Sequence, residues 1–142
     1  MARAQVHLLR LVRTGELQAG VVPTVNTGTL ADLEELGSSP GFMDKLIGVF
    51  AADNRALMAK MESALSRRDV GEFRSHLHAM RGSAAGMGAE RLTALCKDIG
   101  LLSDAEVKLQ VLPLLKNLRD ELASARDALE RYPQGRRQRS AG

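Results

Sequence analysis

HLHAMRGSAAGMG occupies residues 76–88 and continues a helical pattern that begins a few residues earlier. Asp69 and Glu72 form a D-x-x-E helix start, and Gly86 and Gly88 supply the stop. At 100° per residue the apolar residues between them cluster within about 40° of one direction, as the core-facing stripe of a bundle helix does. That stripe comprises Phe73, Leu77, Met80, Ala84 and Met87.

The same arithmetic puts His78 about 140° from Phe73, so that it points away from the core. Four residues surround it on this wheel: Arg74, Arg81, Gly82 and Ala85. Gly82 needs an explanation, because an interior helical glycine costs about 1 kcal/mol relative to alanine.

The direction of helical side chains supplies one explanation for Gly82. Side chains lean toward the helix N-terminus, so a bulky residue at 82 would cover His78, and glycine leaves the ring open to a partner. Near neutral pH an imidazole offers an unprotonated nitrogen as a nucleophile. A phosphoryl group added there would bring about two negative charges, which Arg81 could meet. The alternative is a solvent-exposed histidine beside ordinary surface arginines.

His76 lies about 60° from the centre of the stripe, which predicts packing or hydrogen bonding at the core edge. Cys96 falls on an apolar helix side with no His or Cys at metal-ligand spacing. We interpret it as a small buried hydrophobe. No residue pattern indicates a metal site.

Two further helices are expected before this one. A T-x-x-D start at Thr29 predicts a short helix over 29–37, with Leu30, Leu33 and Leu36 buried. Ser39 followed by Pro40 is an N-cap and first-position pair that opens a helix over 40–67. Asn54 interrupts its apolar stripe and is interpreted as a boundary or partner-facing residue. The stripe comprises Leu46, Phe50, Leu57, Met61 and Ala64 or Leu65.

Two more helices are expected after it. Residues 89–102 place Leu92, Leu95, Cys96 and Ile99 on one side. Ser103 and Glu106 form a capping box that opens a helix over 104–131, which Pro113 should kink or split. Its stripe comprises Leu112, Leu115, Leu118, Leu122, Ala125 and Leu129. Short connections make these helices antiparallel neighbours, so the prediction is an all-α, up-down four-helix bundle with helix 29–37 capping one end.

Composition and charge fit one intracellular domain. The chain has 142 residues, 44% hydrophobic and 26% charged, with one cysteine, and a lone cysteine fits a reducing compartment. Residues 29–132 hold 14 basic and 16 acidic residues, so the net charge of +3 comes wholly from the flanks. This distribution argues against nucleic-acid binding. We predict a linker or docking segment over 1–28, the domain over 29–132 and a disordered basic tail over 133–142, without direct membrane contact.

His78-Ala79-Met80-Arg81-Gly82, with Gly88 after five further residues and then ERLTALCKDIG at 90–100, resembles the signature of histidine-containing phosphotransfer (HPt) domains of two-component phosphorelays. The resemblance covers about residues 30–128, through LADLEELG, FMDKLIGVF, MESALSRRD and FRSHLHAMRGSAAGMGAERLTALC in order. Two departures are visible. The family usually has lysine at the position of Arg81, and a small hydroxyl residue is common at that of Ala79.

The resemblance implies a helical bundle in which His78 takes a phosphoryl group from a receiver-domain aspartate and passes it to another. Arg81 would stabilise the phosphate, Gly82 would give access, and Arg74, Ala85 and Gly88 would support the site. It implies a cytoplasmic, monomeric phosphocarrier without an ATP site or cofactor of its own, whose receiver partners bring Mg²⁺. We expect it to be the C-terminal domain of a hybrid sensor histidine kinase.

Two alternatives remain open at this point. One is a helical module that docks receivers without phosphoryl flow. The other is the dimerisation and phosphoacceptor part of a histidine kinase, although no acidic residue follows His78 and no ATP-binding domain is present.

Overall fold

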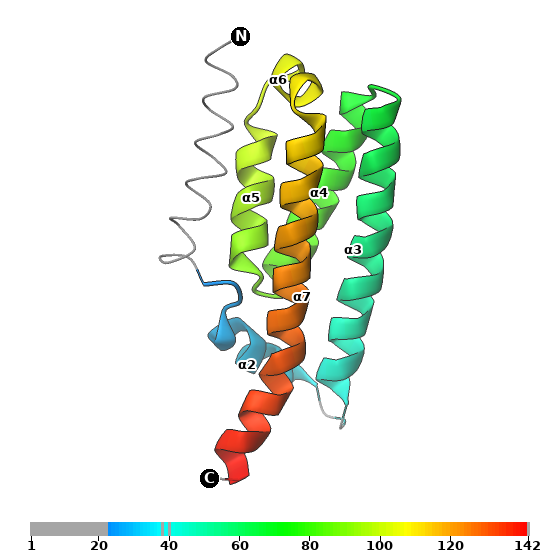
Figure 1. The fold of residues 1–142 in the computed structure, drawn as a ribbon. Helices are drawn as coiled ribbons and strands as arrows, with labels where there is room; N and C mark the ends of the chain where they lie inside the picture. The colour runs from blue at the N-terminus through cyan, green and yellow to red at the C-terminus, as the bar shows by residue number, and fades with distance from the viewer. Residues whose placement is uncertain (1–22, 38, 40, 142) are drawn as a thin grey trace.

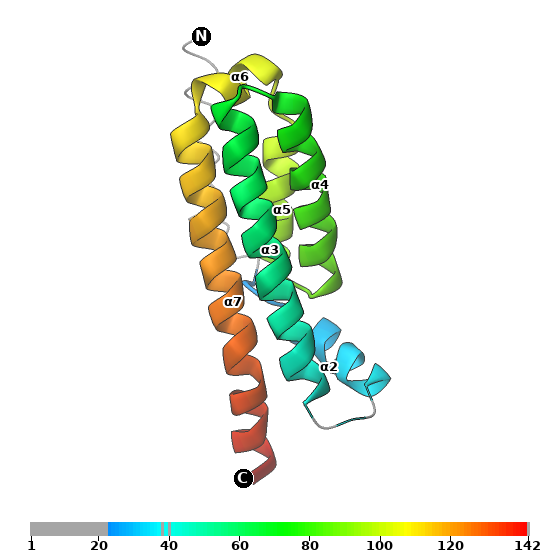
Figure 2. The same cartoon turned by 90° about the vertical axis from the view of Figure 1, so that its right-hand side faces the viewer.

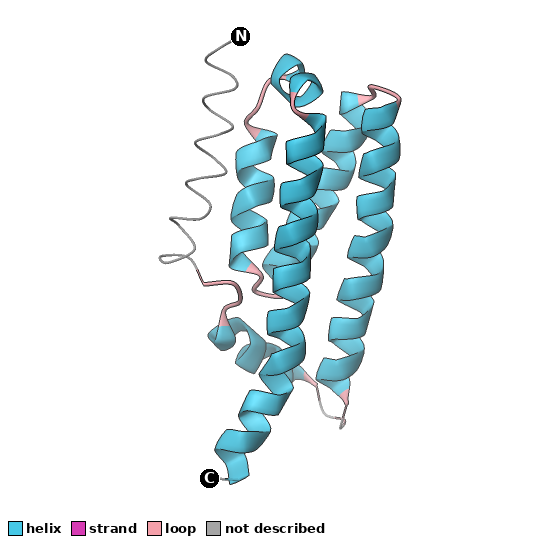
Figure 3. Cartoon of the chain, in the orientation of Figure 1, coloured by secondary structure: helices cyan, strands magenta, loops and turns pink. Residues whose placement is uncertain are grey.

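A computed structural model describes residues 23–37, 39 and 41–141, with side chains as far as Tyr132. It contains α2 (Thr27–Leu36), α3 (Phe42–Ser66), α4 (Val70–Gly86), α5 (Glu90–Gly100), α6 (Asp104–Leu109) and α7 (Val111–Ala141). The described residues contain no strand (Figure 3). Helices α3, α4, α5 and α7 form an up-down bundle, with α6 at one end and α2 at the other (Figure 1). The predicted all-α four-helix bundle with a capping helix is confirmed.

The four long helices pack in a ring. Helix α4 packs on α3 and α5, and α7 packs on the same two helices. Figure 2 shows α3 between α7 and α4. None of the helices in the described part of the chain is both long and apolar enough to cross a membrane. Most of residues 1–28, the predicted linker or docking segment, lie outside the described residues.

The core is mainly aliphatic, with Phe50 and Phe73 among its buried side chains. Each fully buried large apolar side chain stabilises the fold by about 1.5–3 kcal/mol. All five stripe residues are buried, four in α4 and Met87 at its C-cap, and so are Leu92, Cys96 and Ile99 of α5. In α3 the stripe residues Phe50, Met61, Ala64 and Leu65 are buried, whereas Leu46 and Leu57 are partly buried.

Two predicted core leucines are wrong. Leu36 is 80% exposed and Leu112 is 77% exposed, and Leu114 is buried where Leu112 was expected. Both errors come from following leucines spaced by three residues, because each such step drifts about 60° around a helix. Leu36 is two steps from buried Leu30, and Leu112 is two steps from buried Leu118, so each lies about 120° off the core direction.

Asn54 is neither a boundary nor a partner-facing residue, which corrects both interpretations. It is 0% exposed. Its side-chain Nδ2 donates to the Phe50 carbonyl oxygen at 2.8 Å and to Ser83 Oγ of α4 at 3.0 Å. Asn54 therefore joins α3 to α4 through a polar contact inside the core. These two bonds satisfy Nδ2, since an unpaired buried polar group costs about 1–3 kcal/mol, whereas Oδ1 is buried without a hydrogen-bond partner among the described residues.

The first two helix starts differ from the predictions. Asn26 is the N-cap of α2, with Oδ1 accepting from the Thr29 backbone N–H at 3.1 Å, so the helix begins ahead of the predicted T-x-x-D start. Helix α3 begins at Phe42 with Gly41 as N-cap. Ser39 instead lies in the preceding turn, where its carbonyl accepts from the Phe42 N–H at 3.2 Å. Pro40 lies outside the described residues.

The later starts agree better with the sequence. Asp69 caps α4, and the Ser103–Glu106 capping box opens α6 with both of its hydrogen bonds present. The predicted split of the last helix is confirmed at Gln110, which separates α6 from α7. Pro113 explains the position of the split, because its ring is incompatible with the helical carbonyl four residues earlier, at Leu109.

Helix α7 continues to Ala141, whereas the sequence predicted a disordered tail from Pro133. Proline removes one helical hydrogen bond at its own position. The residues after it include arginine, glutamine and alanine, which favour helix.

Candidate functional site

His78 lies on the outward face of α4. Its ring is exposed, while Leu77 and Met80 on either side of it in the sequence are buried. The helix is held in this rotation by its apolar stripe, since turning His78 inward would expose Phe73 and Ala84. The prediction that His78 points away from the core is confirmed.

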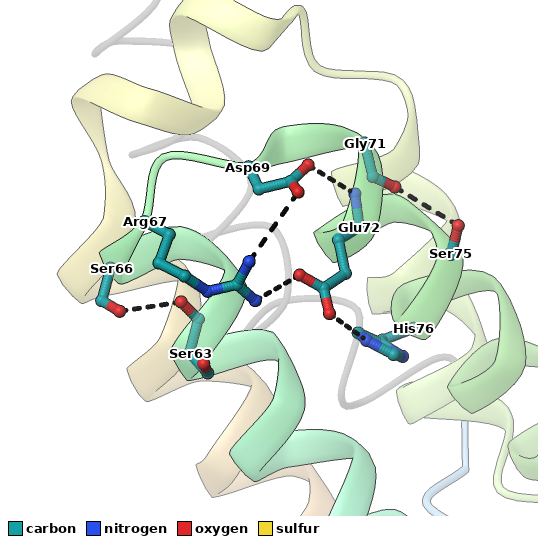
Figure 4. A network of polar contacts seen from close by, with 8 residues as sticks. All are labelled: Ser63, Ser66, Arg67, Asp69, Gly71, Glu72, Ser75 and His76. Carbon is teal, nitrogen blue, oxygen red and sulfur yellow. Dashed lines mark hydrogen bonds and ion pairs between the residues drawn. The ribbon is translucent and has the colours of Figure 1, made fainter.

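His76 is at the edge of the core and takes part in a polar network at the α3–α4 turn (Figure 4). Its side chain is 20% exposed, and its Nε2 lies 3.5 Å from Glu72 Oε1. Glu72 also pairs with Arg67, and the hydrogen bond from Arg67 holds the pKa of the Glu72 carboxyl below its ordinary value. His76 therefore has the hydrogen-bonding role at the core edge that its position predicts, and the two histidines of the stretch lie in different surroundings.

Arg74 is held by the α5–α6 connection. Its Nη2 donates to the Leu102 carbonyl at 2.7 Å and pairs with Asp104 Oδ1 at 2.8 Å, and its Nη1 donates to the Gly100 carbonyl at 3.4 Å. The guanidinium of α4 thereby satisfies backbone carbonyls at the C-terminal end of α5. These contacts give Arg74 a structural task, so its expected support of His78, which stays a prediction, would act through the position of α4 and not through contact with the phosphoryl group.

Arg81, three residues after His78, has no ion pair or side-chain hydrogen bond within the described part of the chain, and it is exposed. Its charge acts on the buried thiol of Cys96 across the α4–α5 contact. Burial raises the pKa of that thiol to about 12, and the nearby guanidinium opposes the rise. Of the two arginines predicted near His78, Arg81 is thus the one whose donors bind no other described residue.

Gly82 and Ala85 are exposed on the same face of α4. A Cβ atom built on Gly82 meets nothing within 4 Å. Packing inside the domain therefore does not require glycine at this position. Close approach of a partner to His78 would explain a residue that weakens the helix, and this role of Gly82 stays a prediction.

Gly88 does a different job, at the turn between α4 and α5. It is buried with φ of +72°, and a Cβ there would lie 3.0 Å from Thr29 Cβ and 3.2 Å from the Asn26 carbonyl oxygen. Its own carbonyl accepts from the Asn26 N–H at 2.7 Å. Gly88 therefore allows α2 to dock on the bundle. Its expected support of the site around His78 would act through this docking.

Sequence reasoning missed the polar contacts that hold α4 and the start of α2 in place. Ser83 follows Gly82 directly and accepts the hydrogen bond from buried Asn54. Asn26 Nδ2 also donates to Glu90 Oε1, and Arg91 bridges Glu121 and Thr24. The one signal for the first contact was a polar residue on an apolar stripe; the others join residues more than 29 positions apart. Among the described residues, no group of three or more His, Cys, Asp or Glu side chains is placed to hold a metal ion.

The arrangement suits transfer of an anionic group to a ring nitrogen. The imidazole of His78 is accessible, Arg81 follows one turn later without a partner among the described residues, and no side chain at 82 obstructs the approach. A guanidinium forms strong, forked hydrogen bonds to phosphate oxygens.

Comparison with known proteins agrees with this chemistry. The family model for the Hpt domain matches residues 45–131. Histidine-containing phosphotransfer protein 4 of Arabidopsis thaliana is 27% identical over 105 residues, which cover 71% of this chain and 83% of that protein.

Two solved structures share the fold. Histidine-containing phosphotransfer protein B of Pseudomonas aeruginosa has a TM-score of 0.67 at 23% identity, covering 79% of this chain and 96% of the other. A putative histidine-containing phosphotransfer protein from rice has a TM-score of 0.68 at 18% identity, covering 97% and 98%.

Proposed function

The chain belongs to the Hpt domain family, and from that membership we propose that it is a phosphorelay intermediate that carries the phosphoryl group on His78. It accepts the group from the aspartate of one receiver domain and delivers it to the aspartate of another. It is a carrier and not a kinase. The observation that supports His78 most directly is its exposure on the outward face of α4, inside the matched family region.

The transfer is an in-line displacement at phosphorus. The lone pair of a His78 ring nitrogen forms the N–P bond while the bond between phosphorus and the aspartyl oxygen breaks, and that electron pair stays on the aspartate carboxylate. The second step reverses these roles with the next receiver. Because such transfers depend on positioning and on neutralising the phosphoryl oxygens, the chain needs little beyond a well-placed ring and a nearby cation.

Arg81 is proposed as that cation. It follows His78 by one turn and its guanidinium has no partner within the described residues, so phosphorylation would not have to break an existing ion pair. An arginine presents a planar fork of donors where lysine presents a compact ammonium. Gly82 is proposed to leave space over the His78 ring for the receiver. Ala85 on the same face has a small side chain and is proposed to leave space in the same way.

Receiver domains are the proposed partners, and the proposal assigns Mg²⁺ to the receiver, where the ion would neutralise phosphoryl oxygens during transfer. We further propose a cytoplasmic, monomeric module that forms the C-terminal domain of a hybrid sensor kinase. The linker-like composition of residues 20–28 supports this context, although Asn26 at its end is bound to Gly88 of the domain.

The test compares two histidine variants of the full chain. Wild type, His78→Gln and His76→Gln are each offered a panel of radiolabelled phosphoreceivers, and transferred label is followed with time. We expect acid-labile label on wild type and on His76→Gln, and none on His78→Gln. His76→Gln is the matched control, because it removes the other imidazole of the same helix.

Phosphoramidate, a small phosphoryl donor, then separates accessibility of the ring from recognition of the receiver. It should label wild type and His76→Gln without any receiver. Label that persists on His78→Gln would assign the phosphoryl group to another residue. A wild type that binds receivers but takes no label from them or from phosphoramidate would favour the docking module without phosphoryl flow.

A further inference from the structure

A groove of about 320 Å³ runs between α3 and α7. Its floor is apolar, formed by Met58 of α3 and Leu122 of α7. Ala59 and Ala123 beside them are short, so the two helices leave the floor open. Three arginines and one glutamate stand around it. The function proposed above uses none of these residues.

An ion pair fixes which residues face each other across the groove. Arg119 Nη1 of α7 lies 3.3 Å from Glu62 Oε1 of α3. The two helices are antiparallel (Figure 2), so moving seven residues, or about two turns, along each helix from this pair leads to Arg55 on α3 and Arg126 on α7. Both also line the groove. Two guanidinium groups therefore stand at the same level on opposite walls.

Neither Arg55 nor Arg126 has an ion pair or side-chain hydrogen bond within the described part of the chain. The domain around them is slightly acidic, with 14 basic against 16 acidic residues over 29–132. A groove that gathers three arginines against one carboxylate thus departs from the charge of its surroundings. Two facing cations repel each other and favour an anion between them.

Charge also decides among possible occupants. Residues 1–22 carry three arginines and one glutamate, and residues 133–142 carry three arginines and no acid. Both flanks therefore have the same sign as the groove. A second copy that presents the same groove would bring arginines against arginines. The complementary occupant is an acidic segment from a different protein, with an apolar side chain for the floor.

We propose that the α3–α7 groove binds an acidic amphipathic helix of a partner protein. An apolar side chain of that helix rests on Met58 and Leu122. A carboxylate one turn along it lies between Arg55 and Arg126, because these arginines stand three and four residues from the two floor residues. Helices commonly bind in such grooves through anchors spaced by one turn.

This surface is separate from His78. The groove is lined by α3 and α7 alone, whereas His78 lies on α4, which packs on α3 and α5 (Figure 2). A helix in the groove would leave the outward face of α4 uncovered. The groove therefore anchors the domain to a partner while His78 stays available to a receiver.

The test uses synthetic helical peptides and the full chain. The probe is a fluorescein-labelled peptide with leucine and glutamate spaced by four residues on one face, followed by fluorescence anisotropy. We expect saturable binding that weakens about 10-fold or more in Arg55→Gln/Arg126→Gln, as loss of interfacial charge pairs does. Ala59→Glu, an exposed substitution at the rim, should weaken it similarly. Lys60→Gln is the matched control, because it removes an exposed charge of α3 that does not line the groove.

Several results would overturn the proposal. The proposal fails if a peptide with lysine in place of glutamate, or a scrambled acidic peptide, binds as tightly as the probe. It also fails if Lys60→Gln weakens probe binding as much as Arg55→Gln/Arg126→Gln does. Concentration-dependent dimers in light scattering that Ala59→Glu abolishes would make the groove a self-association surface. If the wild-type chain sediments with anionic phosphatidylglycerol vesicles, the double variant does not, and the peptide fails to bind, the groove is a membrane-binding site. Phosphoryl transfer to His78 stays at the wild-type rate in all these variants, so this test does not depend on the relay proposal.

Discussion

Replacing Gly82 with glutamine should change stability and phosphoryl transfer in opposite directions. In the free protein the new side chain meets no obstacle, since a Cβ at 82 has nothing within 4 Å. Removing glycine from a helix interior gains about 0.5–1 kcal/mol. For a chain of this size that gain corresponds to a rise in Tm of about 2–4 °C.

The cost appears when a receiver approaches. A glutamine at 82 leans toward the helix N-terminus and covers the surface over His78. It must be held aside for the ring to react, and confining a glutamine side chain costs about 1.5–2 kcal/mol of conformational entropy. Added to the barrier, this amount slows transfer by about 10–30-fold.

The assay pairs guanidinium unfolding with timed transfer from a radiolabelled phosphoreceiver. Gly82→Ala gives the helix gain without a side chain that has rotamers, and should transfer within about 3-fold of wild type by the same entropy scale. Gly48→Gln repeats the substitution at an exposed position of α3 that also has nothing within 4 Å. It should gain stability and leave transfer unchanged.

The reasoning is refuted if Gly82→Gln transfers as fast as wild type. It also fails if Gly82→Ala and Gly48→Gln are slowed as much as Gly82→Gln, because the effect would then come from stiffening the domain and not from covering His78.

Three further predictions concern residues around the site. Arg74→Ala should lower the free energy of unfolding by about 1–2 kcal/mol, because it removes the bonds to Asp104 and to two backbone carbonyls. The rate of phosphoryl transfer at saturating receiver should stay near the wild-type value. Urea unfolding checks the first expectation and the transfer assay checks the second. Arg67 lowers the pKa of Glu72 below 4.5, so Glu72 contributes stability above pH 4.5 that is lost as the pH falls through its folded-state pKa. Measured by urea unfolding between pH 3 and 6, the free energy of unfolding should therefore fall less steeply with decreasing pH in Glu72→Gln than in wild type. Identical pH dependences would contradict the pairing. Burial raises the pKa of the Cys96 thiol to about 12, so at pH 8 about one thiol in 10⁴ is ionised. A thiol reagent should therefore label Cys96 only in denaturant. Rapid labelling of the folded protein would contradict this, because it would show that the thiol is accessible.

Local patterns predicted much of this fold because they depend on neighbours in the sequence. The D-x-x-E start and the stripe of α4 set the rotation of that helix, and the rotation alone turns His78 outward. The Ser103–Glu106 box and Pro113 likewise act over three or four residues. Each of these predictions is confirmed, because a helix forms these contacts within its own turns.

One error arises where a residue's surroundings come from another helix. Asn54 is polar on an apolar stripe, and only Ser83 of α4 explains its burial. Leu36 and Leu112 are errors of a second kind, because each lies about 120° from the core direction of its own helix and is exposed. For Asn54 the sequence shows which way the side chain turns and leaves open what it meets, whereas for the two leucines the direction itself was misassigned.

The sequence by itself therefore determined an exposed histidine on a helical bundle, with two arginines and a glycine near it. The tertiary structure decided how those neighbours divide. Arg74 is bound by the α5–α6 connection, Arg81 has no partner among the described residues, and Gly88 allows α2 to dock. It also brought Arg55 and Arg126, 71 residues apart in the chain, to facing walls of one groove. The physical reason is that helix periodicity follows from local hydrogen bonding, whereas the partners of a side chain depend on how whole helices pack.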